Sequence, residues 1–390
     1  PTNMLVSGRS YEVRFRAVDR AGNLEPLTEK TTFYFDVSSP TTKINAPTDG
    51  QYLTSLATVT ISVLDNLLSV NNIQKVEYSI YVDTGGFYRA ATRDFESTTQ
   101  YFNPAVSTMS NLSFVYASSV PWVSGRRYTI TSRATDKSGN QPTTFSLATD
   151  SVSFVFDNTP PAVGVIEPSG LREVNVPTLT GTAQDQPVFG NQLISAVQIR
   201  IRQDSPDVDS NNEFNKYWVP GTISAPQFNL VANGSEWFDA DTANSFLNWS
   251  SGTFAQTFFV QNASYSIIVR ARDQAGTYSA VYATSSFIAD RVLPVSYVTN
   301  PSSTVIAGIT TGILSGTASD SGLGTVQFSS VAIKNLNTGL WYDNANFTQA
   351  TINWLPVQQP FTPANPASWT YNLLSNVKLR SGTSYYITSK

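Results

Sequence analysis

Apolar and polar side chains alternate along much of the chain with a period of two, which is the spacing of a β-strand that buries one face. The clearest stretches are residues 11–17, 128–134 and 265–271, where every second side chain is apolar or small. No segment keeps a helical period for more than a turn or two, so the pattern predicts an all-β protein. The side chains expected to face a core are Tyr11, Val13, Phe15 and Ala17, then Tyr128, Ile130, Ser132 and Ala134, and then Tyr265, Ile267, Val269 and Ala271.

These stretches belong to a longer motif that repeats along the chain. It begins Ser-Gly-x-x-Tyr, ends Arg-Ala-x-Asp-x-x-Gly-Asn, and occupies residues 7–23 and 124–140. A third copy runs from 265 to 276 and a fourth begins at 381–385; the Asp follows the Tyr by eight residues in the three complete copies. An Asp acceptor followed by Gly favours a tight turn, so each copy predicts a hairpin.

A second repeated signature marks expected joints between domains. An apolar strand ends in Asp, a Pro follows four residues later, and another Pro follows seven residues after that. Proline donates no hydrogen bond to a sheet, so it marks the exit from one sheet and the entry to the next. The three copies are Asp36, Pro40 and Pro47, then Asp157, Pro161 and Pro168, and then Asp290, Pro294 and Pro301.

The joints predict four units along the chain. Residues 1–38 would be the final hairpin of a truncated domain, 39–158 and 159–291 two complete domains, and 292–390 a domain truncated at its C-terminus. The chain begins and ends inside a repeated motif, which indicates a window of a longer polypeptide. About seven short strands in each complete unit predict a β-sandwich, and the Tyr near the start of the penultimate strand resembles the tyrosine corner of such sandwiches.

Further motifs recur inside the predicted units. Each unit has an early strand that ends in Asp, and two of these strands read Gly-Thr-Ala-x-Asp. A Trp-aromatic-Asp patch stands at residues 237–239 and 341–343, and a second tryptophan follows each patch, at Trp249 and Trp354. We expect the patches to pack in the core rather than to stack on sugar rings. We expect the outward Arg16, Arg133 and Arg270 to pair with a neighbouring acid rather than to bind a polyanion.

Taken together, these motifs resemble bacterial immunoglobulin-like repeats of the fibronectin-III or Big type, and the resemblance covers nearly the whole chain. Such repeats form long arrays in very large bacterial cell-surface and extracellular proteins. The fold class implied is all-β: tandem immunoglobulin-like β-sandwich domains in an elongated array. The third hairpin departs from the pattern with Thr277 in place of Asn, and the unit at 39–158 has only Phe87-Tyr88 in place of the Trp patch.

The resemblance implies a structural role at a bacterial cell surface or outside the cell, in a surface layer, sheath, filament or stalk. Its partners would be neighbouring repeats and other copies of the protein in a surface assembly. Two alternatives stay open: an adhesin whose domain loops bind a glycan or a protein, and a spacer for an extracellular enzyme whose catalytic domain lies outside these residues.

Composition narrows the chemistry. The 390 residues carry a net charge of −4 without a basic block, so nothing attracts nucleic acid. The absence of Cys and His excludes disulfides, thiolate metal sites and the usual Ser-His-Asp arrangement. No apolar run of about 18 residues predicts a membrane-spanning helix. Because the acids stand in repeating turns, whereas a catalytic site usually occurs once, we expect no enzymatic activity within this stretch.

The repeated Asp residues predict calcium at the joints. In an immunoglobulin-like sandwich the incoming linker, the loop after the second strand and the final hairpin turn gather at one end, and each carries an Asp. Converging carboxylates repel one another unless a cation is present, and calcium takes six to eight oxygen ligands. The alternative is that each Asp only caps its own turn. The expected ligands are Asp36, Asp65 and Asp136 at one joint, Asp157, Asp185 and Asp273 with Asn158 at the next, and Asp290 and Asp320 at a third whose last member follows Lys390.

Overall fold

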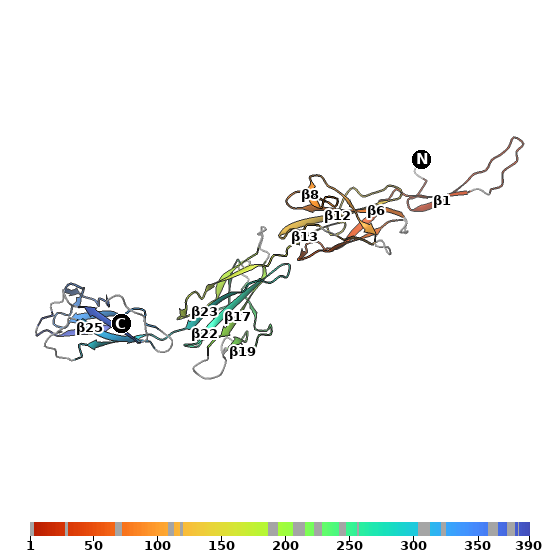
Figure 1. Ribbon diagram of the computed structural model, residues 1–390. Coiled ribbons are helices and arrows are strands. Elements are labelled where there is room, and N and C mark those ends of the chain that lie inside the picture. The colour runs from red at the N-terminus through yellow and green to blue at the C-terminus, as the bar shows by residue number, and fades with distance from the viewer. Residues whose placement is uncertain are drawn as a thin grey trace.

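The computed structural model is made of β-strands that form an elongated array (Figure 1). In the part of the chain that the structure describes there is no α-helix, and hence no helix that is long and apolar enough to cross a membrane. The described residues are 4–27, 30–66, 72–107, 113–117, 120–185, 194–205, 215–221, 228–241, 247–255, 257–302, 313–320, 325–357, 366–372, 379–380 and 382–390.

The array begins with a hairpin of β1 (Arg9–Arg14) and β2 (Lys30–Phe35), which pair in antiparallel register. The predicted core face of this hairpin is not buried: Val13 is 48% exposed and Phe15 62% exposed. That part of the prediction is wrong because no sheet among the described residues packs against the hairpin. The alternation of apolar and polar residues is that of a strand, but its apolar side chains are buried only where a second sheet packs against them.

The first sandwich consists of strands β3 to β13. In one sheet, β5 lies between β3 and β11; in the other, β12 lies between β6 and β13. This division of the strands is that of an immunoglobulin-like sandwich. The strands are β3 (Thr41–Ala46), β4 (Tyr52–Leu53), β5 (Thr58–Leu64), β6 (Ile73–Val82), β7 (Phe87–Arg89), β8 (Asp94–Ser97), β9 (Asn103–Pro104), β10 (Val106–Ser107), β11 (Ser113–Ala117), β12 (Arg126–Asp136) and β13 (Ser151–Phe156).

The second sandwich repeats this plan. β16 lies between β14 and β21 in one sheet, and β22 lies between β17 and β23 in the other. The strands are β14 (Ala162–Glu167), β15 (Arg172–Glu173), β16 (Thr180–Gln184), β17 (Ile194–Gln203), β18 (Lys216–Trp218), β19 (Phe228–Leu230), β20 (Phe238–Asp239), β21 (Asn248–Ser250), β22 (Ser264–Asp273) and β23 (Ala283–Ala289).

The third sandwich keeps the same order as far as the chain continues. β25 lies between β24 and β30, and β31 pairs with β26 in the other sheet. The strands are β24 (Val295–Asn300), β25 (Ile313–Ser319), β26 (Ser330–Asn335), β27 (Trp341–Tyr342), β28 (Phe347–Gln349), β29 (Leu355–Pro356), β30 (Ala367–Asn372) and β31 (Tyr385–Ser389).

The second proline of each joint signature lies where the chain changes sheets. β3 pairs with β5, and beyond Pro47 the short β4 pairs in parallel with β13 of the opposite sheet. Pro168 separates β14 from β15 in the same way, and the bonds before Pro47, Pro168 and Pro301 are all cis. Pro47 and Pro168 therefore mark a passage between the two sheets of one sandwich, whereas the sequence motif predicts them at the joints between domains.

Each sandwich has its own aromatic-rich core between the two sheets. In β12 the predicted face is buried from Tyr128, 1% exposed, to Ala134, 0% exposed. The equivalent face of β22, from Tyr265 to Ala271, is also fully buried. The two faces lie in register with β6 and β17 respectively, which confirms the alternation for these hairpins.

The buried tryptophans explain the glycine of Gly-Thr-Ala-x-Asp. Gly181 on β16 is paired with Trp249 on β21, and Gly316 on β25 is paired with Trp369 on β30. Both tryptophans are 1% exposed. The equivalence proposed for Trp354 is therefore wrong: Trp354 is only half-buried, with the Lys390 ammonium 4.6 Å from its ring centre.

Candidate metal centres at the domain joints

The hairpin Asp residues are held by the turn that follows them. Asp136 Oδ1 accepts the backbone N–H of Asn140 at 2.9 Å, and its Oδ2 accepts the Asn140 side-chain amide at 2.8 Å. Asp273 Oδ1 accepts the N–H of Thr277 at 2.7 Å. The glycine before each of these partners has a positive φ, 89° at Gly139 and 92° at Gly276, which a residue with a side chain rarely adopts. Turn capping therefore does occur: it fixes both carboxylate oxygens of Asp136 and Oδ1 of Asp273.

The linker Asp residues are held by the serine of the Ser-Gly-x-x-Tyr motif. Ser124 Oγ donates to Asp157 Oδ1 at 2.9 Å and accepts the N–H of Asn158 at 3.0 Å. In the same way, Ser7 Oγ donates to Asp36 Oδ1 at 3.0 Å and accepts the N–H of Val37 at 3.0 Å. No role was predicted for this serine, although its recurrence before Gly at positions 7, 124 and 381 was a usable signal. It orients the acid that ends one domain toward the domain that follows.

The tyrosine of the same motif forms a corner. The Tyr128 hydroxyl accepts the N–H of Val123 at 2.9 Å, and the Tyr265 hydroxyl accepts that of Val260 at 2.8 Å. The hydroxyls of Tyr11 and Tyr385 make the same contact, each with the N–H five residues earlier. The corner fixes the start of the hairpin from which the joint is built, as in other immunoglobulin-like sandwiches.

The structure brings both complete sets of three acids together. At the first joint Asp36 follows β2, Asp65 follows β5 and Asp136 ends β12, and one oxygen of each lies within 4.8 Å of the others. The second joint gathers Asp157, Asp185 and Asp273 within the same distance and from the equivalent segments. Each set thus combines the end of one domain with two loops of the next, as the sequence predicted.

The acids of the second joint are buried, and few hydrogen bonds compensate their negative charge. Asp157 is 0% exposed and Asp273 1% exposed, and the Oδ2 atom of each has no hydrogen-bond partner in the part of the chain that the structure describes. Burial raises the pKa of Asp273, and the negative charge of Asp157 adds to that rise. An uncompensated carboxylate in such a place is costly, and a bound cation would relieve the cost.

The first joint has more hydrogen-bond donors. The Asn66 amide donates to Asp36 Oδ1 at 3.2 Å, and the Asn72 amide donates to Asp36 Oδ2 at 3.3 Å and to Asp65 Oδ2. Burial alone would raise the pKa of Asp36, but hydrogen bonds from Ser38, Ser7 and these two amides lower it. The sequence analysis did not identify the two asparagines, because neither belongs to a repeated motif.

The remaining predicted ligands lie apart from these two sets. Asp290 Oδ1 accepts the side-chain amide of Gln261 at 3.0 Å. Among the described residues no group of three acids includes Asp290 or Asp320. Asn158 is exposed beside the second joint, and its backbone N–H is the one that Ser124 accepts.

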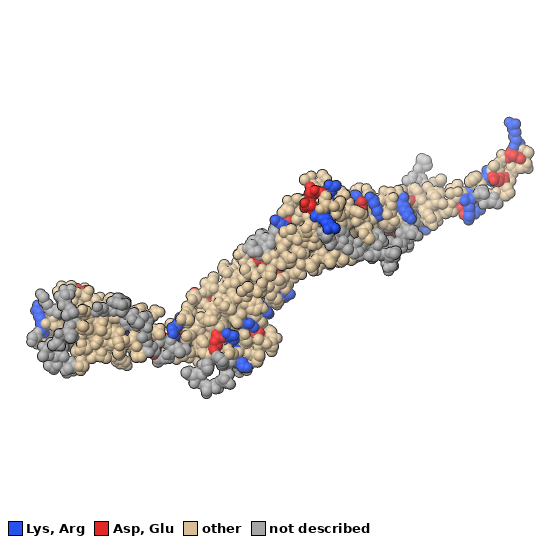
Figure 2. Space-filling model, in the orientation of Figure 1, with Lys and Arg blue, Asp and Glu red and all other residues tan. Residues whose placement is uncertain are grey.

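The outward arginines differ between domains. Arg133 pairs with Glu77 at 2.9 Å, as expected. Arg270, at the equivalent position, instead donates to the neutral amide oxygen of Gln198 at 2.9 Å, and its guanidinium lies 4.1 Å from the ring centre of Trp237. On the face shown in Figure 2, acidic and basic side chains lie in small mixed groups.

We expected both aromatic residues of each Trp-aromatic patch to pack in the core, but only the second aromatic residue of each patch does so. Phe238 packs against the core of the second sandwich and Tyr342 is buried in that of the third. Trp237 and Trp341 are half-buried on the opposite side of their strands, each beside a cation. The period of two forces this result, because adjacent residues of a strand point to opposite faces.

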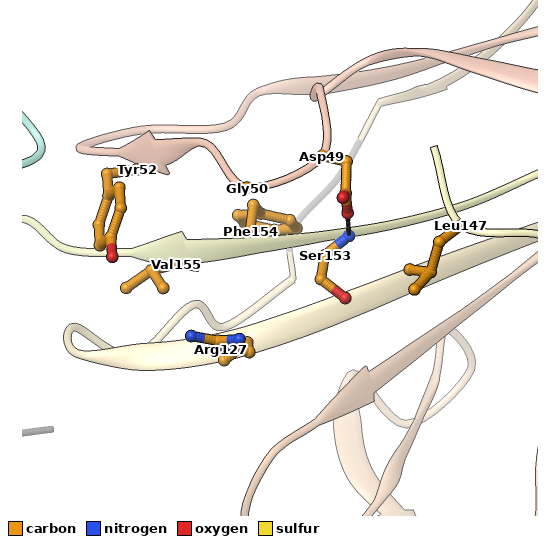
Figure 3. A pocket seen from close by; sticks show the side chains of 8 residues that line it. All are labelled: Asp49, Gly50, Tyr52, Arg127, Leu147, Ser153, Phe154 and Val155. Atoms are coloured by element: carbon orange, nitrogen blue, oxygen red, sulfur yellow. Dashed lines mark hydrogen bonds between the residues drawn. The ribbon is translucent and has the colours of Figure 1, made fainter. Parts of the chain in front are cut away.

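A groove of about 300 Å³ lies along β13 in the first sandwich (Figure 3). Asp49 and Arg127 contribute its charged groups, and Asp49 Oδ1 accepts the N–H of Ser153 at 2.7 Å. This hydrogen bond extends the pairing of β4 with the same edge of β13, where the Gly50 N–H also donates to the Ser153 carbonyl oxygen at 2.7 Å. The groove is separate from the two sets of acids at the joints.

No protein-family model and no curated protein matches the chain. Among solved structures it is similar to a tetra-tandem repeat from the extending region of a large adhesion protein, with 14% identity over 100% of this chain and 82% of that one and a TM-score of 0.31. It is also similar to the Escherichia coli adhesin FdeC, with 10% identity, 87% and 90% coverage and a TM-score of 0.35. The fibronectin(III)-like modules of Clostridium thermocellum CbhA align at 14% identity, with 64% and 94% coverage and a TM-score of 0.27. At such values the similarities establish no activity, and the tandem immunoglobulin-like fold rests on the strand order of the chain itself.

Proposed function

We propose that this chain is a structural repeat region of a large bacterial cell-surface or extracellular protein. Its sandwiches, with boundaries near residues 38, 158 and 292, extend the parent protein from the surface or build a layer, sheath or filament. The observation that carries the proposal is the construction of the joints: at each complete joint, acids from two successive units meet within 4.8 Å. A cation bound by such a set of acids would hold neighbouring units in line, and stacked repeats gain stability chiefly from their neighbours.

The same proposal includes calcium as the ion that holds the joints. Carboxylate oxygens are the ligands that calcium prefers, and backbone carbonyls and water complete a shell of six to eight. The residues proposed to hold it are Asp36, Asp65 and Asp136 at the first joint, Asp157, Asp185 and Asp273 with Asn158 beside them at the second, and Asp290 and Asp320 at the third.

Thermal unfolding of the full chain with calcium or with a chelator tests this function. An ion at one hundred times its dissociation constant stabilises the folded state by about 2.7 kcal/mol, which for a domain of this size is a rise in Tm of about 5–10 °C. Magnesium at the same concentration should have a smaller effect, because it prefers a rigid octahedral shell.

The variant Asp157→Asn should lose most of the calcium-dependent rise in Tm. Asp94→Asn is the matched control, because Asp94 lies on β8 and its Oδ1 accepts only the next backbone N–H, at 2.7 Å. Equal midpoints of the unmodified chain in calcium and in chelator would rule out calcium as the ion of these joints.

A further inference from the structure

We infer that the two complete joints bind calcium in a fixed order: the Asp157–Asp185–Asp273 joint fills at low calcium, and the Asp36–Asp65–Asp136 joint fills only at higher calcium. This inference rests on the proposed function, since it concerns the same ion at the same joints. The two joints differ in their affinity for calcium, so the array stiffens one joint at a time as the calcium concentration rises.

The second joint is arranged for a cation because two buried carboxylate oxygens there have no hydrogen-bond donor among the described residues. Asp157 Oδ2 and Asp273 Oδ2 are both buried without a hydrogen-bond partner. The other oxygen of each acid is fixed, by Ser124 and by the Thr277 N–H respectively. The carboxylates are therefore oriented in advance, and an ion would displace no hydrogen bond from these two Oδ2 atoms.

At the first joint, amide groups occupy the corresponding places. Asp136 Oδ2 accepts the Asn140 side-chain amide at 2.8 Å. The amide of Asn72 bridges Asp36 and Asp65, and that of Asn66 donates to Asp36. An ion that binds all three acids must break or rearrange these contacts. Losing one hydrogen bond to a charged acceptor corresponds to about a tenfold loss of affinity or more.

One sequence difference accounts for part of this contrast. The hairpin turn ends in Asn140 at the first joint and in Thr277 at the second. Both residues cap their Asp through the backbone N–H, at 2.9 and 2.7 Å. Only the asparagine also carries an amide that donates to the second carboxylate oxygen, at 2.8 Å. Because Thr277 replaces this asparagine, Asp273 Oδ2 has no amide donor from its own turn.

Calcium titration of the full chain by isothermal calorimetry tests the order. We expect two binding steps whose dissociation constants differ at least about tenfold. Asp273→Asn should remove the tighter step, and Asp136→Asn the weaker one. Two steps of equal affinity, or loss of the tighter step in Asp136→Asn, would overturn the inference while leaving calcium at the joints intact. No calcium binding at all would instead refute the proposed function.

A reciprocal exchange of the turn residues tests the cause without removing a carboxylate. Thr277→Asn should weaken the tighter step about tenfold, and Asn140→Thr should strengthen the weaker step by a similar factor. Both changes keep the backbone cap of the turn. If Thr277→Asn instead tightened binding, its amide oxygen would be acting as a ligand, and the explanation by amide competition would be wrong.

Discussion

In the smaller sheet of the second and third sandwiches, a glycine on the central strand leaves room for a buried tryptophan on the neighbouring strand. A Cβ added to Gly181 would lie 2.0 Å from the Gly164 carbonyl oxygen and 2.2 Å from the Trp249 ring, and the same geometry surrounds Gly316. In the first sandwich the equivalent pair is Ile61 opposite Phe114. The glycine of Gly-Thr-Ala-x-Asp is therefore required where a tryptophan lies across the ladder, as at Gly181 and Gly316.

Gly181→Ala should destabilise the second sandwich by at least about 3 kcal/mol, because the added methyl meets a backbone carbonyl that cannot move without breaking the sheet. Chemical denaturation of the variant and of the unmodified chain measures the difference. Gly252→Ala is the control, since nothing lies within 4 Å of its added Cβ. Equal losses for the two variants would show that the tight contact does not carry the effect.

Tyr128→Phe should reduce stability by about 1 kcal/mol, because it removes the hydroxyl that accepts the Val123 N–H at 2.9 Å and leaves the ring in place. Denaturant midpoints measure this change. Tyr81→Phe is the matched comparison: Tyr81 is 37% exposed, and water can replace its hydroxyl contacts. A Tyr128→Phe variant as stable as Tyr81→Phe would contradict a structural role for the corner.

At the scale of the element, the hairpins were predictable because both their alternation and their turn residues are local. The buried faces of β12 and β22 followed from a period of two, and the turn followed from Asp and Gly. Facts that depend on a distant partner were not predictable in this way. The first hairpin lacks an opposing sheet among the described residues, and Trp369 rather than Trp354 is equivalent to Trp249 because strand pairing, not spacing, selects it.

The turn between β27 and β28 should titrate at unusually low pH. Hydrogen bonds from the Thr348 hydroxyl and from the N–H groups of Asn346 and Ala345 lower the pKa of Asp343 from 3.8 to about 2. Because the folded pKa is depressed, the charged carboxylate stabilises the turn above about pH 4, and this contribution disappears as the pH falls through about 2.

Carbon-detected NMR of the Asp343 carboxyl against pH measures this shift directly. The unmodified chain should titrate near 2, and Thr348→Val should move the midpoint upward because it removes the hydroxyl donor that contributes most. A midpoint near 3.8 in the unmodified chain would contradict the hydrogen-bonded turn.

At the scale of the whole molecule, the convergence of the acids was predictable and the neutralisation of their charge was not. The repeated Asp positions, placed on an immunoglobulin-like sandwich, were enough to bring two sets of three together. The amides of Asn66 and Asn72 were missed because they occur once and act through the folded loop. A repeat pattern shows what the joints share, whereas their differences come from residues outside the pattern.

We expect the shape of the array to depend on whether a cation occupies these joints. Figure 1 shows the sandwiches arranged end to end. One set of three acids lies at each of the two joints, Asp36, Asp65 and Asp136 at the first and Asp157, Asp185 and Asp273 at the second. Without a cation, the buried carboxylates of the second joint repel one another, and the free-energy cost falls when the joint opens. An ion removes that repulsion, and the extended arrangement then becomes the most stable one.

Small-angle X-ray scattering of the full chain, in calcium and in chelator, tests this claim most directly. With calcium, we expect the radius of gyration of the extended array in Figure 1. In chelator, and in the Asp136→Asn/Asp273→Asn variant with calcium present, the joints should sample bent arrangements, with a smaller mean radius and a broader distance distribution. Superimposable scattering of the unmodified chain with and without calcium would contradict it.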